Sequence, residues 1–513
     1  MLSKINSAFA TGIDAHIVNV EVDLSSGIPS FTMTGFLGSQ VKEAGEKVRT
    51  ALRNIGHRIP GSRIVVNVSP ASIHKSGTMF DLPVAIGILC NLGVLDEKLF
   101  DGTVIVGELS LDGTINKIRG VLPMVSEARR NGMSRIIVPQ GNVCEARLIE
   151  GIEIIGVNHI LQLLNFDETL NNLKNVTYKK ETEKGGGENK LDFSQVCGQY
   201  MAKRAILIAA AGKHHILFSG PPGSGKTLLA SRIPTILPRL SEEEIIEVAK
   251  IYSVAGVFEE NMSCITSRPF RSPHHTISQS ALIGGGMYPI PGEITLAHKG
   301  VLFLDELTKF KTPVIECLRQ PLEEKSIRII RNSGMYQYPA DFMLVAAMNP
   351  CKCGYYPDRN LCRCTDYDIA KHIGKLSSPL IDRFDLAVHV ERPKYDELAS
   401  DAVAVSNANG MNSKSMRDKV IMAYEIQKKR FKEEGICFNS QMTTSMLKKY
   451  CKLDKKCNDL LRASFEKFRL SGRGYGKILK VARTIADIEG AEKIQEHHIS
   501  EAVCFRSFEA ERW

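Results

Sequence analysis

Long apolar runs are absent from this sequence. No uninterrupted apolar stretch in the 513 residues approaches the roughly 18 residues that a helix needs to cross a bilayer. The first residues, MLSKINSAFATGIDAHIVNVEVDL, also lack the sustained apolar core of a signal peptide. These absences exclude an integral membrane protein, and we expect a soluble, cytoplasmic chain that has no membrane partner.

A disulfide framework and a strong charge of one sign are missing as well. The 13 cysteines are an odd number in a large chain without a secretion signal, which argues against paired cysteines. The net charge of +9 is a mild excess. It is compatible with a nucleic-acid partner, but a solvated helical surface explains it equally well.

The most informative stretch present is GPPGSGKT, which matches the phosphate-binding pattern G-x-x-x-x-G-K-[S/T] at every position. Its members are Gly220, Pro221, Pro222, Gly223, Ser224, Gly225, Lys226 and Thr227. An apolar run at residues 216–218 precedes it as a strand would, and a helix opens at Thr227. Backbone N–H groups of such a loop converge on phosphate oxygens at a helix N-terminus. We expect Lys226 to reach the β- and γ-phosphates of ATP and Thr227 to ligate Mg2+.

A second motif, VLFLDE, places two carboxylates after an apolar run. Residues 301–304 predict a central buried strand, and Asp305 and Glu306 follow at its carboxyl end, where open α/β sheets bind ligands. A buried acidic pair is hard to explain as core, because unpaired carboxylates cost several kcal/mol there. We therefore predict that Asp305 holds Mg2+ and Glu306 polarises the attacking water. A third strand, residues 342–347, leads to Asn349, which we expect to orient that water.

Two later segments fit roles at the γ-phosphate. Arg383, within LSSPLIDRFDLAV, resembles the arginine finger of AAA+ ATPases, which a neighbouring subunit supplies to the transferring phosphoryl group. Arg473 fits the sensor-2 position at the entrance of a lid helix, and Arg483 on the same helix is the competing candidate. For either one alone, a solvated lid arginine is an equally good interpretation. Lid helices are predicted at residues 415–431, 440–450, 457–468, 474–488 and 500–508.

The first 175 residues alternate strand and helix patterns, as an α+β domain does. Strands are predicted at residues 17–22 and 63–68, and helices at residues 39–52 and 81–92. Ser39 is the expected N-cap of the first helix. A hairpin with an Asp-Gly turn is predicted at Asp112-Gly113.

Two stretches of this domain, FDLPVAIGI (residues 80–88) and the segment from Gly107 to Pro139, resemble the proteolytic domain of Lon proteases. That family uses a Ser–Lys dyad, in which the lysine takes the serine proton. The corresponding positions here hold Val84 and Leu122, and neither is a nucleophile or a base. The resemblance therefore implies the fold without peptidase activity, and a surface for docking or oligomerisation.

A flexible linker is predicted at residues 176–191, which are charged and contain three consecutive glycines. The segment after it, residues 191–211, predicts a loop and a helix. In many ATPases such a lead-in packs over the adenine, and Val196 and Gly198 are the candidate contacts here.

Four cysteines form the pattern C-x-C-x8-C-x-C at Cys351, Cys353, Cys362 and Cys364. Four thiolates this close in sequence can close a tetrahedral Zn2+ site, which would be structural because no position stays open. The spacing is tighter than in the usual C-x2-C pairs. Zinc and four reduced cysteines in a loop therefore both remain open.

Two further segments are candidates for contact with a partner in a central pore. Residues 268–294 are rich in Gly, Pro, Ser and His and bring Arg268, Arg271, His274 and His275 together. Residues 328–338 predict a hairpin around Asn332-Ser333-Gly334, whose Arg328 and Arg331 would meet phosphates and whose Tyr336 would stack on a base.

Taken together, these parts resemble the ComM/YifB family of Mg-chelatase-like AAA+ ATPases over nearly the whole chain. RPFRSPHHTISQSALIGGG (residues 268–286), PGEITLAHKGVLFLDEL (291–307), CLRQPLEEKSIRIIR (317–331) and KILKVARTIADI (477–488) are typical of it. The resemblance implies an α/β fold class with an inactive Lon-like α+β domain (residues 1–175), a linker, a P-loop AAA+ core (192–395) and a helical lid (396–513).

The same resemblance implies a homo-hexameric ring that hydrolyses ATP with Mg2+ and acts on branched or single-stranded DNA, as a branch-migration helicase does. Two alternatives remain open. One is a chelatase-like ATPase that works with partner subunits. The other is an ATP-driven protein remodeller or scaffold whose Lon-like domain binds polypeptide.

Overall fold

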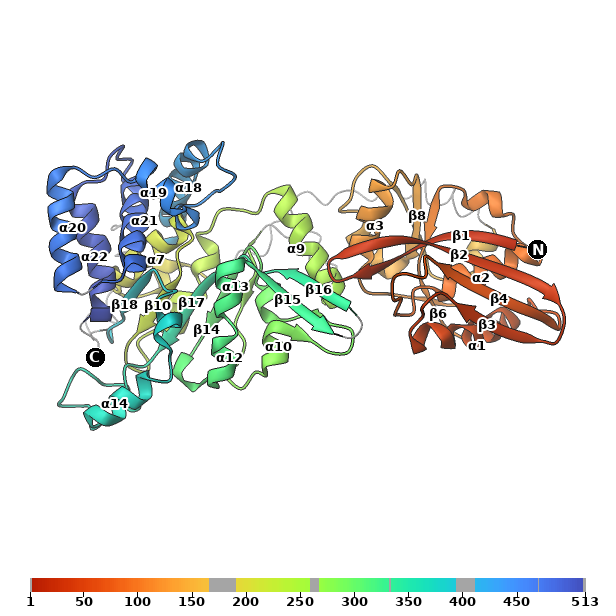
Figure 1. Ribbon diagram of the computed structural model, residues 1–513, viewed down its shortest axis with the longest axis horizontal. Helices are drawn as coiled ribbons and strands as arrows, with labels where there is room; N and C mark the ends of the chain where they lie inside the picture. The colour runs from red at the N-terminus through yellow and green to blue at the C-terminus, as the bar shows by residue number, and fades with distance from the viewer. Residues whose placement is uncertain are drawn as a thin grey trace.

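The computed structural model describes residues 2–165, 191–258, 267–331, 334–393, 411–468 and 470–510. The predicted linker, residues 176–191, lies outside these ranges apart from Leu191. Three parts follow one another along the long axis of the molecule: an N-terminal domain, a core built on a parallel sheet, and a helical lid (Figure 1). None of the described helices is both long and apolar enough to span a bilayer.

The N-terminal domain is organised around a seven-stranded sheet with the order β3-β4-β2-β1-β5-β8-β9. Both predicted strands are confirmed within it, as parts of β2 and β4. The strands are β1 (Leu2–Thr11), β2 (Asp14–Ser26), β3 (Ser30–Thr34), β4 (Ser62–Ser69), β5 (Thr103–Ile105), β8 (Arg135–Pro139) and β9 (Glu153–Val157). The helices are α1 (Ser39–Asn54), α2 (Asp81–Asn91), α3 (Val121–Arg130), α4 (Val143–Ala146) and α5 (Leu161–Leu164).

The hairpin predicted in this domain is confirmed, and the predicted N-cap of its first helix is wrong. The Asp-Gly hairpin is present as β6 (Glu108–Leu109) and β7 (Ile115–Asn116), and Asp112 Oδ1 accepts a hydrogen bond from the Thr114 N–H at 3.0 Å. Ser39 is not the N-cap of α1. That position belongs to Gly38, whose extended backbone (φ −67°, ψ 166°) makes Ser39 the first helical residue.

The core contains a five-stranded parallel sheet with the order β11-β14-β17-β10-β18. Its strands are β11 (Phe270–Arg271), β14 (Val301–Leu304), β17 (Met343–Met348), β10 (Ile216–Ser219) and β18 (Leu386–His389). β10, β14 and β17 are completely buried, as continuous apolar runs in a sheet covered on both faces should be. The three strands predicted from apolar runs are therefore confirmed.

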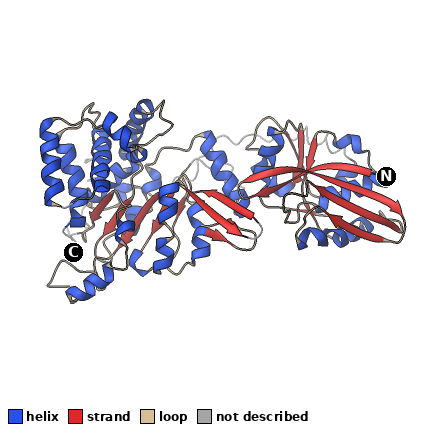
Figure 2. Cartoon of the chain, in the orientation of Figure 1, coloured by secondary structure: helices blue, strands red, loops and turns tan. Residues whose placement is uncertain are grey.

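Short helices and two hairpins surround this sheet (Figure 2). The helices are α7 (Tyr200–Gly212), α8 (Lys226–Ala230), α9 (Glu242–Ala255), α10 (Gln279–Ile283), α11 (Glu293–Leu296), α12 (Thr312–Glu316), α13 (Arg319–Glu324), α14 (Asp366–Ile373) and α15 (Ser378–Ile381). The hairpins pair β12 (Gly284–Gly285) with β13 (Ile290–Pro291), and β15 (Ser326–Arg331) with β16 (Gly334–Pro339). The predicted pore segment, residues 268–294, contains β11, α10, the β12–β13 hairpin and the start of α11.

The lid is helical as predicted. Its helices are α18 (Ser413–Arg430), α19 (Thr444–Tyr450), α20 (Lys455–Lys467), α21 (Gly472–Ile488) and α22 (Glu496–Ala510). The boundaries shift by up to four residues, since α22 begins at Glu496 and not at Ser500. The helix expected at residues 440–450 is divided into a single 3-10 turn (Asn439–Gln441) and α19. Thr443 caps α19 by accepting from the Met446 N–H, which fixes the later start.

The N-terminal domain docks onto the core through α3 and α9. Leu122, at the lysine position of the Lon-type dyad, is fully buried, and its backbone N–H donates to Ser253 Oγ of α9 at 3.2 Å. The Gly120 N–H donates to the Ser253 carbonyl oxygen at 3.0 Å. Val84, at the serine position, is also fully buried. The N-terminal end of α3 therefore serves as a contact surface between the two domains.

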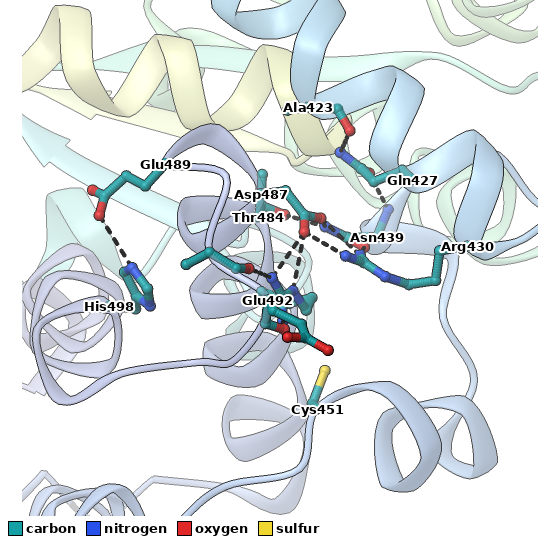
Figure 3. Close-up of polar contacts among 12 residues, drawn as sticks. Ala423, Gln427, Arg430, Asn439, Cys451, Thr484, Asp487, Glu489, Glu492 and His498 are labelled. Atoms are coloured by element: carbon teal, nitrogen blue, oxygen red, sulfur yellow. Dashed lines mark hydrogen bonds and ion pairs between the residues drawn. The ribbon is translucent and has the colours of Figure 1, made fainter.

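A buried polar network holds the lid helices together (Figure 3). Asp487 on α21 is 1% exposed, and its carboxylate accepts from Arg430 on α18 and from Asn439 Nδ2 at 2.8 Å. Arg483 also reaches this carboxylate, at 3.0 Å, and donates to two backbone carbonyl oxygens. Arg483 is 3% exposed and fully engaged, so it is not available as a sensor for a nucleotide.

We predict that Asp487→Asn unfolds the lid at lower temperature, because the isosteric amide leaves two arginines without their counter-charge. Breaking a buried ion pair from one side costs about 3–5 kcal/mol. For a lid of about 100 residues, that cost corresponds to a fall of roughly 15–25 °C in the midpoint. Calorimetry and hydrogen exchange on lid amides measure it. Asp459→Asn, at an exposed position of α20, is the matched control and should leave the midpoint unchanged. Equal midpoints for the two variants would contradict a structural role for the network.

Candidate active site

The phosphate loop, the two carboxylates and Asn349 meet at one edge of the core sheet. β10 pairs in parallel with β17, and β17 with β14, so the residues that follow these strands emerge side by side. A cleft of about 590 Å3 lies there, lined by residues 222–228, Ser231, Asp305, Glu306 and Asn349. Gly220 begins the loop at a crowded point, where an added Cβ would lie 2.1 Å from the Val390 carbonyl oxygen.

Lys226 is held against its own loop. Its Nζ donates to the carbonyl oxygens of Gly220 and Pro221 at 2.8 Å each, and to Asn349 Oδ1 at 3.3 Å. Burial lowers the pKa of Lys226, and the nearby carboxylates oppose this shift. The ammonium group therefore lies within reach of the loop that would cradle phosphate and of the asparagine at the end of β17.

Thr227 and Asp305 form the pair expected around Mg2+. The Thr227 hydroxyl donates to Asp305 Oδ2 at 2.6 Å across the cleft floor. Hydroxyl and carboxylate oxygens are hard donors of the kind that Mg2+ takes together with phosphate oxygens and water. The donor set therefore fits the metal.

Glu306 lies at the cleft rather than in the core. Its side chain is 41% exposed, so the acidic pair is not buried as the apolar run before it suggested. The Glu306 backbone is left-handed at φ 52°, a strained conformation of the kind that accumulates at functional sites. Lys309 Nζ lies 2.7 Å from Glu306 Oε1, and His275 Nδ1 lies 3.5 Å from Oε2. The carboxylate is thus positioned from two sides.

His275 is a residue of this site that sequence reasoning placed elsewhere, in the pore segment. It follows β11, and β11 pairs with β14 in parallel. The loop after β11 therefore runs beside Glu306, which follows β14. Only the order of the strands in the sheet could have predicted this contact, and the local sequence does not reveal that order.

The two arginines of the same segment make close contacts within the chain. Arg268 is 7% exposed and donates to the Pro238 and Lys299 carbonyl oxygens at 2.8 Å each. Arg271 forms a bidentate ion pair with Glu293, with both distances 2.7 Å. Both guanidinium groups are used to hold the segment on the core, which corrects the prediction that they meet a partner.

Arg383 and Arg473 lie together, away from the cleft of their own chain. Both approach Glu323 Oε1, Arg383 as a close ion pair and Arg473 at 4.0 Å. Neither belongs to the residues that line the cleft. The Arg383 side chain is 13% exposed, and Arg473 is 62% exposed. Arg473 thus lies outside the cleft lining, and its role at the γ-phosphate stays a prediction.

The lead-in segment packs beneath the phosphate loop. Val196 is a buried member of the apolar core, and its carbonyl oxygen accepts from Lys203 Nζ at 2.7 Å. Neither Val196 nor Gly198 lines the cleft. Gln199 Nε2 donates to the Glu391 carbonyl oxygen at 2.6 Å and to that of Ser224 at 3.4 Å, which ties the lead-in to the loop.

The four clustered cysteines converge. Their sulfur atoms all lie within 4.8 Å of one another. The Sγ–Sγ distances are 3.3 Å between Cys351 and Cys353, 3.7 Å between Cys351 and Cys362, and 3.6 Å between Cys353 and Cys362. Burial raises the pKa of Cys353, but the Tyr355 backbone N–H and the neighbouring thiols outweigh it and lower that pKa to about 6. The arrangement suits thiolates that share one cation.

A second group of possible ligands, Glu489 with His497 and His498, behaves differently. The Gln495 N–H donates to His498 Nδ1 at 2.9 Å, so Nε2 carries the proton of the neutral ring. That Nε2 donates to Glu489 Oε2 at 3.1 Å (Figure 3). His498 therefore has no free lone pair for a metal, and the group is a hydrogen-bonded part of the lid.

The hairpin of β15 and β16 is confirmed, with the register Arg331 opposite Gly334. Asn332 and Ser333 lie outside the described residues. One face packs on the core through Ile327, Ile329 and Tyr338, and the other exposes Arg328, Ile330 and Met335. Arg331 alternates onto the first face and is exposed beside the turn. An exposed cation and large apolar side chains on one hairpin face are suited to a charged partner with flat apolar groups.

Comparisons with known proteins agree with this architecture. Three family models match: magnesium chelatase subunit ChlI at residues 192–398, subunit ChlI of Mg-chelatase at 20–142, and the magnesium chelatase subunit ChlI C-terminal model at 410–506. Lon protease 2 of Bacillus subtilis is 33% identical over 136 residues, which are 26% of this chain and 24% of the protease. The N-terminal domain is therefore similar to a Lon protease segment.

Two full-length relatives are closer. Competence protein ComM of Haemophilus influenzae is 40% identical over 509 residues, which cover 99% of this chain and 97% of that protein. Uncharacterized protein YifB of Escherichia coli is 38% identical over 508 residues, with coverage of 99% and 97%. Together with the three family matches, this full-length similarity shows that the chain belongs to the ComM/YifB family of Mg-chelatase-like AAA+ ATPases.

Proposed function

We propose that the chain is an ATP-driven hexameric motor that acts on branched DNA, as a branch-migration helicase in recombination and in the integration of transforming DNA. The family itself implies an ATPase that uses ATP and Mg2+. The relative named competence protein ComM supports a role linked to competence. The action on DNA and the assembly into a ring are what we propose beyond this.

The observation that carries it is the separation of the hydrolysis residues onto two faces. The phosphate loop, the carboxylates and Asn349 line one cleft, whereas Arg383 lines a different cavity. A ring of identical subunits would deliver Arg383 of one subunit to the cleft of the next. Arg473 shares Glu323 with Arg383 and would arrive with it. Charge on the transferring phosphoryl group would then be stabilised from outside the subunit that binds ATP.

Each residue of the cleft has a separate task in this proposal. Lys226 would bind the β- and γ-phosphates, and Thr227 and Asp305 would hold Mg2+. The metal supplies charge neutralisation at the phosphate oxygens. Glu306 accepts a hydrogen bond from the attacking water, which it can do because its carboxylate is exposed to the cleft. Asn349 orients the same water from the adjacent strand.

The hairpin of β15 and β16 is the proposed DNA contact. Arg328 is exposed on the face away from the core and Arg331 is exposed beside the turn, where cations would pair with phosphates. Ile330 is 72% exposed and Met335 is 66% exposed, and both would lie against bases. Arg268 and Arg271 of segment 268–294 are not part of the proposed DNA-contact surface, because both are paired within the core. We further propose that Cys351, Cys353, Cys362 and Cys364 hold one structural Zn2+.

The test uses full-length protein, ATP, Mg2+ and a fluorescent synthetic four-way junction. We expect strand separation that Lys226→Ala abolishes, because the phosphates lose their ammonium partner. The Arg328→Gln, Arg331→Gln double variant should keep basal hydrolysis but lose DNA stimulation. Its slope of log affinity against log salt should fall by about 1–2, one for each lost phosphate contact.

The Lys414→Gln, Lys419→Gln double variant is the matched control, because it removes two exposed lid cations. It should behave as the wild type in strand separation, in DNA-stimulated hydrolysis and in the salt dependence of DNA affinity. Wild-type protein without DNA-stimulated hydrolysis and without salt-sensitive DNA binding would overturn the proposal. Equal losses in both double variants would show that the hairpin is not the contact surface.

His275 should act as a positioning residue for Glu306. We expect His275→Ala to lower kcat by about 3–30-fold with little change in KM, since loss of the 3.5 Å contact between His275 Nδ1 and Glu306 Oε2 would cost about 0.7–2 kcal/mol. His275→Asn, which can still donate, should recover part of kcat. His497→Ala removes an exposed lid imidazole and is the control. A change in KM alone, or no rescue by asparagine, would contradict this role.

A further inference from the structure

The four-cysteine cluster has the dimensions of a tetrahedral metal site. With Zn–S bonds of about 2.3 Å, tetrahedral geometry places the sulfur atoms about 3.8 Å apart. The Sγ–Sγ distances among Cys351, Cys353 and Cys362 lie between 3.3 and 3.7 Å. The Gly354 and Tyr356 N–H groups point at Cys351 Sγ, at 3.2 and 3.5 Å, as donors to a thiolate do.

The segment that carries these cysteines has little else to fold around. Its own apolar cluster contains four buried residues, namely Cys351, Cys362, Ile369 and Ile373. The segment ends in α14, which projects from the core beside the sheet edge (Figure 1). So small a core does not offset the entropy of ordering the chain, and segments of this kind usually need a metal or a disulfide.

This cysteine segment is in direct contact with the phosphate loop. Gly354 has a left-handed backbone at φ 88°, and a Cβ there would lie 2.5 Å from Pro222 Cδ. Arg392 bridges the two, because its Nη2 donates to Tyr355 Oη at 3.0 Å and to the Pro222 carbonyl oxygen at 3.4 Å. The Arg392 guanidinium also lies 4.9 Å from the centre of the Tyr355 ring.

A second path runs through α14. His372 Nε2 lies 3.1 Å from the Asn349 carbonyl oxygen, and the Asn349 side chain accepts from Lys226 Nζ. The cysteines, at residues 351–364, lie between Asn349 and His372 in the sequence. A change at the metal would therefore reach the loop from Gly354 and Tyr355, and the catalytic lysine from His372.

We propose that the metal-bound cysteine segment supports the phosphate loop from outside the cleft, so that Zn2+ occupancy sets the affinity of the loop for ATP. This inference rests on the zinc site and the ATPase activity proposed above, and does not depend on DNA. Arg392 is its central residue, because it joins the segment to the loop without belonging to either.

The experiment measures zinc content by metal analysis and ATP affinity with a fluorescent ATP analogue, on full-length protein without DNA. Wild-type protein should contain one Zn2+ per chain. The Cys351→Ser, Cys362→Ser variant should lose it and bind the nucleotide at least about threefold more weakly. Cys437→Ser, at an exposed cysteine of the lid, is the matched control and should change neither value.

Arg392→Ala separates the two parts of the inference. It should keep zinc and still weaken ATP binding by about 3–10-fold, the value of one or two hydrogen bonds. Arg392→Lys should restore part of the affinity. Wild-type protein without zinc would overturn the metal site. Zinc-containing Arg392→Ala with unchanged affinity would overturn the coupling, and wild-type protein that binds no nucleotide would overturn the proposed ATPase itself.

Discussion

The parallel register of β10, β17 and β14 is the constraint on which the rest of this structure depends. Because the strands are paired in order and end at one edge, the phosphate loop, Asn349 and the carboxylates that follow them are brought to a common cleft. The contacts of Lys226 with Asn349 and of Thr227 with Asp305 are direct results of that register. β11 extends the sheet on the same edge and brings His275 to Glu306.

The parts of the site that could be predicted from sequence are those that directly follow a strand, because parallel strands end at a common edge of the sheet. GPPGSGKT and VLFLDE identified the loop and the carboxylates, since each pairs an apolar run with polar residues in a known order. Arg268 and Arg271 were placed in the pore segment, and Arg483 was kept as the alternative sensor, because a guanidinium in a sequence does not reveal its acceptor. Their partners, such as Glu293 and Asp487, depend on packing between distant elements. His275 was assigned to the wrong surface for the same reason.

Two features surround the cleft without belonging to the phosphate-binding motif. The cysteine segment contacts Pro222 through Gly354 and Arg392, and the loop after β11 contacts Glu306 through His275. On the other side, the Lon-like domain packs its α3 against α9, with buried Leu122 where a protease would have its lysine. Its fold is thus kept as a contact surface, and the chemistry of the chain is concentrated in the core.

The central claim is that Arg383 completes the active site of a neighbouring subunit, and subunit mixing tests it most directly. Alone, Lys226→Ala should not bind ATP productively, and Arg383→Ala should bind ATP without hydrolysing it. In a mixed assembly, a Lys226→Ala subunit can still supply Arg383 to the intact phosphate loop of an Arg383→Ala subunit. The account predicts that ATP hydrolysis reappears on mixing. The account is contradicted if the mixed assembly hydrolyses ATP only at the summed rate of the two separate variants. It is also contradicted if Arg383→Ala alone hydrolyses ATP.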